Sequence, residues 1–393
     1  MICLLPHCAY LSETSRMLEL HRALTELGVP VRVATHGGPH ERLLAGIPYD
    51  VLGPGLSPAR AARFVGSAVG LGDPGQSMYE DDEIRSYVQL EAEYFRAHGI
   101  SVAVTGFTLT SLLSSRLAGV RVVTEHAGSF VPPVFERYLP PDRKPAEMDA
   151  YTSGFNRVAD SLGVQGIPSL AALLLGDLSL VPEVAEVLGV SATELAGWNP
   201  DGDPGYRPGS RLAAVGPLFA HLDVPLPDRV QKFLNQPGPT IYLAMTSTPA
   251  AEVRAAIGSL STLDARILVA GTIHSDLADL ATDRILIEGI LPSHLVMPQV
   301  DLAVTTGGQG SVQTAMASGT PLLGVPLHPE QALNLTLVER LGAARAATPI
   351  DNLATLATQL LGSNSHKAAA EDIQKLYAAA DGPADAAELI ASF

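Results

Sequence analysis

One short segment, residues 289–334, does most to restrict what this chain can fold into. Residues 300–304 read VDLAV, a short apolar run that is typical of a buried strand. Three glycines follow within residues 307–310, and residues 311–318 have helical character before a second apolar run at 321–326. Strand, glycine-rich turn, helix and strand together predict a βαβ unit. The helix would begin at the turn, where free N–H groups and the positive end of its dipole favour a phosphate group.

The same segment resembles the donor-site signature of the UDP-glycosyltransferase superfamily, in particular its bacterial natural-product and macrolide-type members. In that signature a proline and an apolar strand precede H-x-G-G-x-G-T, and a small-residue helix, G-x-P, an acidic-Gln pair and an Asn follow. The histidine that contacts the donor diphosphate in the family is Thr306 here. The resemblance implies an α/β fold of the GT-B type, with two Rossmann-like domains facing across a cleft. The matching positions are Pro292, Gly307, Gly308, Gly310, Ser311, Gly319, Pro321, Glu330, Gln331 and Asn334.

Length and charge limit the function classes. The 393 residues are 47% hydrophobic, which is enough for two domains with cores of their own. The net charge of −16 is divided evenly between the two halves, and no basic stretch stands out, which argues against nucleic-acid binding. Cys3 and Cys8 are too close in sequence to staple the fold and are typical of free thiols in a reducing compartment. With neither a signal-peptide pattern nor a long apolar span, we expect a cytoplasmic protein without integral membrane association.

Strand and helix patterns alternate in both halves, which predicts parallel sheets covered by helices. In the first half, residues 2–6 and 31–35 are predicted strands on either side of a helix that starts near Ser12. In the second half, residues 240–245 form a predicted strand and residues 250–260 a predicted helix.

Residues 126–205 break this alternation, because they are rich in proline and glycine. We predict only helical pieces there, at 168–175 and 181–188. In the family, the first domain binds the acceptor, the second binds the nucleotide sugar and a last helix returns to the first domain. The boundaries that we expect on this basis are residues 1–220, 221–382 and 383–393.

The resemblance also implies roles for the donor-binding residues. The glycine-rich turn and the Ser311 hydroxyl would hold the diphosphate, at the position where Thr306 replaces the family histidine. Ser247 would touch a phosphate, Ile290 and Leu291 would lie beside the base, and the acidic-Gln pair would bind sugar hydroxyls. Taken alone, the turn is equally well explained as an ordinary strand–helix connection. The donor-binding residues predicted in this way are Ser247, Ile290, Leu291, Thr306, Gly307, Gly308, Gln309, Gly310, Ser311, Glu330 and Gln331.

The general base is less well defined. In the family a histidine at the start of the first helix removes the acceptor proton, and an aspartate after a later strand orients it. By register this chain has Glu13 and Gly106 at those two places. Glu13 is a weak base unless burial raises its pKa. His7 and His126 follow predicted strands at the edge where doubly wound sheets bind ligands, and His7 has the better ordinary pKa for a base.

Each of these candidates has a structural alternative. Glu13 is also a first-turn acid that complements the helix dipole. His7 and His126 are better explained as loop residues with structural hydrogen bonds, and we assign the remaining histidines that we weighed to structure or surface. The candidates for the base are Glu13, His7 and His126, and the structural or surface histidines are His36, His40 and His294.

The function that this resemblance implies is sugar transfer from a UDP- or dTDP-linked sugar to a hydrophobic small molecule, with inversion at the anomeric carbon. The acceptor would be a natural product, and the reaction would need no metal ion and no cofactor. Because the usual histidine, its aspartate and the diphosphate histidine are all replaced, a non-catalytic homologue that binds a nucleotide sugar or a glycoside is the main alternative. Epimerisation of a sugar nucleotide is a more remote one.

Overall fold

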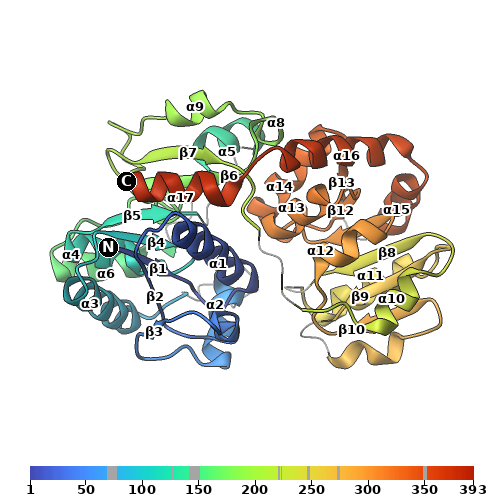
Figure 1. The fold of residues 1–393 in the computed structure, drawn as a ribbon, viewed down its shortest axis with the longest axis horizontal. Coiled ribbons are helices and arrows are strands. Elements are labelled where there is room, and N and C mark those ends of the chain that lie inside the picture. The colour runs from blue at the N-terminus through green and yellow to red at the C-terminus, as the bar shows by residue number, and fades with distance from the viewer. Residues whose placement is uncertain are drawn as a thin grey trace. The chain divides into compact units, whose positions relative to one another are not determined.

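The computed structural model describes residues 1–68, 78–125, 128–140, 151–219, 222, 224–245, 248–271, 275–347 and 352–393. The chain divides into two compact units, which are drawn in Figure 1. Unit 1 comprises Met1–Ala220 together with Asp381–Phe393, and unit 2 comprises His221–Ala380. Each unit is built around its own parallel sheet, so the predicted α/β class is confirmed.

The sheet of unit 1 has the strand order β3-β2-β1-β4-β5-β6-β7 within the described residues. Neighbouring strands are parallel, and β1 pairs on one side with β2 and on the other with β4. The direction of winding therefore reverses between β1 and β4, which is where open α/β sheets hold their ligands. The strands are β1 Ile2–Leu5, β2 Val31–Thr35, β3 Asp50–Val51, β4 Val102–Thr105, β5 Arg121–Thr124, β6 Leu178–Pro182 and β7 Arg211–Val215.

One sequence prediction in this unit is wrong. Residues 181–188 were expected to form a helix, but β6 includes Val181 and the helix α8 is limited to Ala185–Leu188. The run Leu178–Pro182 is buried throughout and pairs in parallel with β7 over its whole length. Periodicity alone cannot separate a short apolar strand from a buried helix, and here the sheet decided the outcome.

The last helix of the chain, α17, belongs to unit 1. Its side chains Ala386, Ala387 and Ile390 share an apolar cluster with Met17 and Leu20 of α1. The helices of unit 1 are α1 Leu11–Glu26, η1 Glu41–Leu44, α2 Pro58–Ala68, α3 Asp81–Ala97, α4 Ser111–Ala118, α5 Pro132–Tyr138, α6 Ser153–Leu162, α7 Leu170–Leu173, α8 Ala185–Leu188, α9 Ala192–Ala196 and α17 Gly382–Ser392.

Unit 2 repeats the architecture with the order β10-β9-β8-β11-β12-β13 in its described part. Its apolar core lies between strands β8, β9 and β11 and helices α11 and α15. The strands are β8 Thr240–Ala244, β9 Arg266–Ala270, β10 Ile285–Glu288, β11 Leu302–Thr305, β12 Leu322–Gly324 and β13 Ala344–Ala346. The helices are α10 Asp228–Leu234, α11 Ala250–Leu260, η5 Ser275–Leu280, α12 Ser293–Val296, η6 Met297–Gln299, α13 Gln309–Ala317, α14 Pro329–Arg340, α15 Leu353–Leu361 and α16 Asn364–Ala378.

Candidate functional site

The glycine-rich turn of unit 2 connects β11 to α13, as the sequence pattern predicts. Gly307 has φ +84°, in the left-handed region that favours glycine, and Gly308 is the N-cap residue of α13. A Cβ on Gly307 would stand 2.7 Å from the side chain of Leu335 and 3.0 Å from the carbonyl oxygen of Gln331. Backbone conformation and close packing against α14 therefore both require glycine at position 307.

The start of α13 can hold an anion. The first N–H groups of a helix have no acceptor within the helix, and the helix dipole adds partial positive charge there. Gly308 has open space where a side chain would stand, because nothing lies within 4 Å of an added Cβ. Gln309, Gly310 and Ser311 form the first turn and are only half-buried. This arrangement suits a phosphate group.

Helix α14 fixes the turn through two amide side chains. Gln331 is 5% exposed, and its Oε1 accepts a hydrogen bond from the Leu327 N–H at 2.8 Å while its Nε2 donates to Thr306 Oγ1 at 3.2 Å. Asn334 Nδ2 donates to the Gly307 carbonyl oxygen at 3.1 Å and also to a carboxylate oxygen of Glu330. The structure therefore brings Thr306, the glycines and the acidic-Gln pair together. It also occupies both polar atoms of the Gln331 amide with protein partners.

The other predicted donor residues lie on a neighbouring segment or outside the described residues. Ile290 and Leu291 follow β10 and precede α12, which contacts α13. Leu291 is buried and Ile290 is half-buried. Ser247 and His126 both fall outside the described residues. Among those that are described, no group of three His, Cys, Asp or Glu side chains is arranged to hold a metal ion.

In unit 1, Glu13 joins the loops that follow β1 and β4. Its side chain is in the first turn of α1 and is 1% exposed. Oε2 accepts a hydrogen bond from the His7 N–H at 2.9 Å, and Oε1 accepts one from the Phe107 N–H at 3.2 Å. A Cβ on Gly106 would lie only 1.9 Å from Oε1, so the carboxyl group fills the space that a side chain at 106 would need. Glu13 and Gly106 are thus sterically matched.

The surroundings of the Glu13 carboxyl raise its pKa. Burial, followed by the nearby charge of Glu125, raises its pKa from 4.5 to about 8. Arg16 opposes this shift, but its guanidinium is paired with Glu125, with Nε 2.6 Å from Oε2. Arg16 is thus shared between Glu125, with which it is paired, and Glu13, whose pKa it lowers only in part.

The His7 ring lies in an environment that differs from the one expected. Its ring stacks on Phe64 with centroids 4.3 Å apart, it is 5% exposed, and within the described residues its Nδ1 has no hydrogen-bond partner. Burial lowers its pKa to about 3. The expectation that His7 has the better pKa for a base is wrong, because burial, and after it the nearby charges of His36 and Arg60, disfavour the protonated ring.

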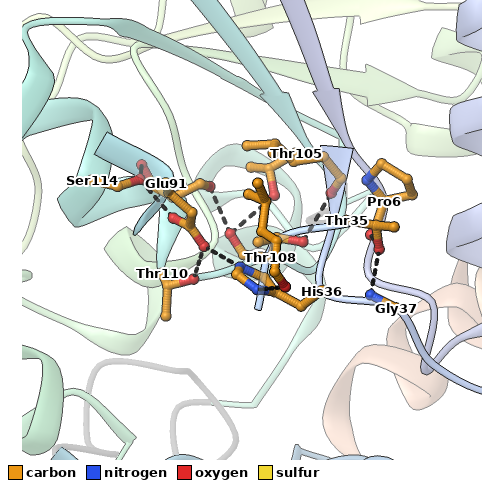
Figure 2. Close-up of polar contacts among 12 residues, drawn as sticks. Pro6, Thr35, His36, Gly37, Glu91, Thr105, Thr108, Thr110 and Ser114 are labelled. Atoms are coloured by element: carbon orange, nitrogen blue, oxygen red, sulfur yellow. Dashed lines mark hydrogen bonds and ion pairs between the residues drawn. The ribbon is translucent and has the colours of Figure 1, made fainter. Parts of the chain in front are cut away.

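A buried carboxylate that the sequence analysis missed ties this edge together (Figure 2). Glu91, on α3, is fully buried; its Oε1 lies 2.9 Å from His36 Nε2, and its two oxygens accept hydrogen bonds from the hydroxyls of Thr110 and Ser114. His36 Nδ1 faces the Leu52 carbonyl oxygen at 3.1 Å. His36 is therefore structural, as expected. The available signal for Glu91 was its position on the apolar face of α3, where a charge has to find partners.

Two threonine hydroxyls hold the carboxyl end of β1 from both sides (Figure 2). Thr35, at the end of β2, donates to the Pro6 carbonyl oxygen at 2.7 Å. Thr108, after β4, donates to the Leu5 carbonyl oxygen at 2.9 Å. Together with the Glu13 and Glu91 contacts, these bonds fix the backbone at the switch point of the unit 1 sheet.

Comparisons with solved structures identify the architecture. The spinosyn rhamnosyltransferase SpnG superposes with a TM-score of 0.68 at 19% identity, covering 100% of both chains. The glycosyltransferase of kitacinnamycin gives a TM-score of 0.72 at 17% identity, over 99% of this chain and 97% of that one. VinC in complex with dTDP gives 0.66 at 19% identity, over 100% of both chains. The chain has the GT-B fold. The predicted likeness to natural-product glycosyltransferases of this fold is therefore confirmed.

No family model matches the chain, and its curated sequence relatives match it only in part. The NDP-glycosyltransferase YjiC of Bacillus licheniformis is 30% identical over 107 residues, which are 26% of this chain and 27% of that protein. A PGL/p-HBAD biosynthesis glycosyltransferase of Mycobacterium tuberculosis is 21% identical over 290 residues, 68% of this chain and 64% of its own length. The matches thus span less than two thirds of either relative.

In the part of this GT-B chain that the structure describes, every helix is too short or too polar to span a membrane.

Proposed function

We propose that this GT-B chain transfers a sugar from a UDP- or dTDP-linked donor to a hydrophobic small molecule, with inversion at the anomeric carbon. The observation that carries the proposal is the turn between β11 and α13, which presents an open helix start and is fixed by Gln331 and Asn334. The GT-B neighbours include VinC in complex with dTDP and SpnG in separate complexes with thymidine diphosphate and with the spinosyn aglycone. These complexes support a nucleotide donor and a natural-product acceptor.

In this proposal unit 2 binds the donor. The N–H groups of the first α13 turn and the Ser311 hydroxyl hold the diphosphate, and Ile290 and Leu291 lie beside the base. Glu330, whose carboxylate is half-exposed, binds sugar hydroxyls. Gln331 acts by fixing Thr306 and the turn, because both of its polar atoms already have protein partners. Unit 1 binds the acceptor at the carboxyl ends of β1 and β4.

The chemistry is a displacement at the anomeric carbon. The acceptor hydroxyl gives up its proton to a base or to water, and its oxygen forms a bond to that carbon on the face opposite the diphosphate. The bond to the diphosphate oxygen breaks, and the electron pair leaves with the diphosphate. Inversion follows from attack on the opposite face. Dipoles that already point at the leaving group stabilise its growing charge without having to reorient. The proposal includes no metal ion.

Nucleotide binding provides the first test. Millimolar dTDP or UDP, added with a chelator and without metal, should raise the melting temperature of the protein, because a ligand that binds only the folded state stabilises it. Ser311→Ala should reduce the shift, whereas Ser363→Ala, at the N-cap of α16, should leave it in place. The absence of any shift with both nucleotides would remove the basis of the proposal.

A non-catalytic nucleotide-sugar-binding protein is the second candidate. It is favoured by the state of the two described base candidates, since Glu13 has both oxygens bonded and His7 has its pKa lowered to about 3. Donor hydrolysis separates the two functions. A transferase is expected to release nucleoside diphosphate slowly from dTDP-glucose or UDP-glucose in the absence of acceptor, whereas a pure binder should bind the donor and release none.

A further inference from the structure

We propose that Glu13 and Gly106 form a brace between the loops after β1 and β4, and that the acceptor is an acidic phenol that brings its own oxyanion. This inference rests on the proposed function and specifies its substrate class. It assigns Glu13 the part of a positioning residue. Glu13 holds the loops beside the acceptor, and water, rather than Glu13 or His7, takes the acceptor proton before the sugar is transferred.

The first step is the geometry of the Glu13 carboxyl. A general base must reach the acceptor hydroxyl within hydrogen-bond distance. Glu13 is 1% exposed, and each of its oxygens accepts a backbone N–H bond, from His7 and from Phe107. These two bonds connect the carboxyl ends of β1 and β4. The group is therefore placed to hold backbone together.

The second step is the space around Gly106. An added Cβ would come within 1.9 Å of Glu13 Oε1 and within 2.2 Å of its Cγ. The glutamate side chain and any side chain at 106 exclude each other. Position 106 therefore cannot supply an orienting carboxylate while Glu13 is present. The Glu13 carboxyl fills the space that the side chains of positions 13 and 106 would otherwise share.

The third step is the charge of the neighbours. On α1, Arg16 is committed to Glu125, which follows β5 and adds negative potential. From the loop after β1, His7 is uncharged, and Cys8 and Tyr10 have thiol and phenol groups whose pKa burial raises. Glu13 has both carboxyl oxygens bonded to backbone N–H groups, and His7 has its pKa lowered to about 3, so neither described candidate is placed to act as a base.

The fourth step concerns the shape of the acceptor. Tyr10 and Phe107 flank the brace with ring centroids 4.9 Å apart, and both are half-buried at this edge. Aromatic rings favour an aromatic partner in offset or edge-to-face packing. The acceptor has to pack against aromatic rings and has to ionise without a base from Glu13 or His7. A phenol does both, because its ring can pack on Tyr10 and Phe107 and its hydroxyl ionises in water. The phenolate oxygen then attacks the anomeric carbon, and the diphosphate leaves with the electron pair.

Three aromatic acceptors test this inference on the intact chain, with dTDP-glucose and UDP-glucose as donors. The acceptors are 4-nitrophenol, which is half-ionised near neutral pH, phenol, which ionises near pH 10 as the tyrosine side chain does, and benzyl alcohol, which does not ionise in water. We expect glycoside from 4-nitrophenol, at least about tenfold slower product from phenol at neutral pH, and none from benzyl alcohol. The pH at half-maximal rate should move upward with the pKa of the acceptor.

Glu13→Gln provides the variant arm. The amide keeps the size of the acid and one of its two backbone hydrogen bonds, so turnover of 4-nitrophenol should fall by less than about tenfold and the pH profile should stay in place. A loss of about 10²-fold or more, as removal of a general base produces, would overturn the inference. So would a pH midpoint that is the same for both phenols, or benzyl alcohol turned over as fast as 4-nitrophenol. These outcomes differ from failure of the proposed function, in which neither nucleotide binds.

The double variant Glu13→His with Gly106→Asp provides a gain-of-function arm. It replaces the brace by a base and its orienting acid in the same space. We expect it to form glycoside from benzyl alcohol, which the parent chain does not. If the parent chain binds the donor but glycosylates none of the three acceptors, that result would count against the inference, because an ionised acceptor should need no general base.

Discussion

At the scale of single residues, Glu13 shows how strongly context changes a side chain. The sequence allowed it to be a base or a first-turn acid. In the structure its carboxyl group bonds to the N–H groups of two loops distant in sequence and stays off the solvent-exposed surface. Neither the match with Gly106 nor the commitment of Arg16 to Glu125 could be derived from spacing, because both depend on how β1, β4 and β5 come together.

The raised pKa of Glu13 predicts a pH dependence of stability. In the unfolded chain its carboxyl releases a proton near its ordinary pKa of 4.5, whereas the folded protein retains it up to about 8. Between these values the folded state holds more protons, so rising pH favours unfolding by up to about 1.4 kcal/mol per pH unit. Urea denaturation of the parent and of Glu13→Gln across this range should show the parent losing stability relative to the variant. A constant difference between the two would contradict the prediction.

Glu330 offers a second prediction at this scale. Its carboxylate is half-exposed beside the glycine-rich turn, so we expect it to contact the sugar and not the diphosphate. Glu330→Ala should weaken binding of dTDP-glucose by about tenfold, in line with roughly 1.4 kcal/mol for a charge-assisted hydrogen bond, and leave dTDP binding within about twofold. Calorimetry with both ligands measures this. Equal losses would mean that Glu330 serves only to hold Asn334.

At the scale of elements, the sequence was most informative where chain geometry requires glycine. The strand, turn and helix around Gly307 could be predicted because a residue with left-handed φ that packs closely against a helix has to be glycine, and glycine is visible in the sequence. It was least informative where tertiary pairing decided the outcome. Val181 belongs to β6 because β7 pairs with it, and Glu91 lies on the buried face of α3 because His36, Thr110 and Ser114 meet it there.

Two neighbouring glycines give a prediction for the turn. Gly307→Ala should destabilise unit 2 by about 1–3 kcal/mol, because φ +84° and the contact with Leu335 both disfavour a Cβ. Gly308→Ala is the matched control, since its backbone is extended and its Cβ would meet nothing within 4 Å. The control should fold normally, yet bind dTDP less tightly because the new methyl group occupies the proposed phosphate position. Thermal melts with and without dTDP distinguish the two effects, and equal melting points without ligand would contradict the packing argument.

At the scale of the whole molecule, the chain leaves unit 1, forms unit 2 and returns to unit 1 with α17. The return is a packed contact. Ile390 is 1% exposed in the cluster that contains Met17 and Leu20, and a Cβ on Gly382 would stand 2.3 Å from the carbonyl oxygens of Gly216 and Pro217. Stability of unit 1 therefore depends on residues that follow unit 2 in the sequence.

Substitution in α17 tests this dependence. Ile390→Ala should lower the stability of unit 1 by about 2–5 kcal/mol, the usual range for truncating a buried aliphatic side chain. Glu388→Ala, on the exposed face of the same helix, should change it by less than about 0.5 kcal/mol. Hydrogen exchange read separately for the two units should place the loss in unit 1. A loss confined to unit 2 would show that α17 has a different partner.

The fit between Glu13 and Gly106 also restricts the order in which mutations can change this site. Any side chain introduced first at 106 meets the glutamate at 1.9 Å, so that intermediate has to displace the Glu13 side chain from its two hydrogen bonds. Replacing Glu13 first opens the space, and the second change can then enter it. Only one of the two single-step routes between this arrangement and a histidine–aspartate pair therefore avoids the collision. A library that varies position 106 alone would miss every productive combination at this edge.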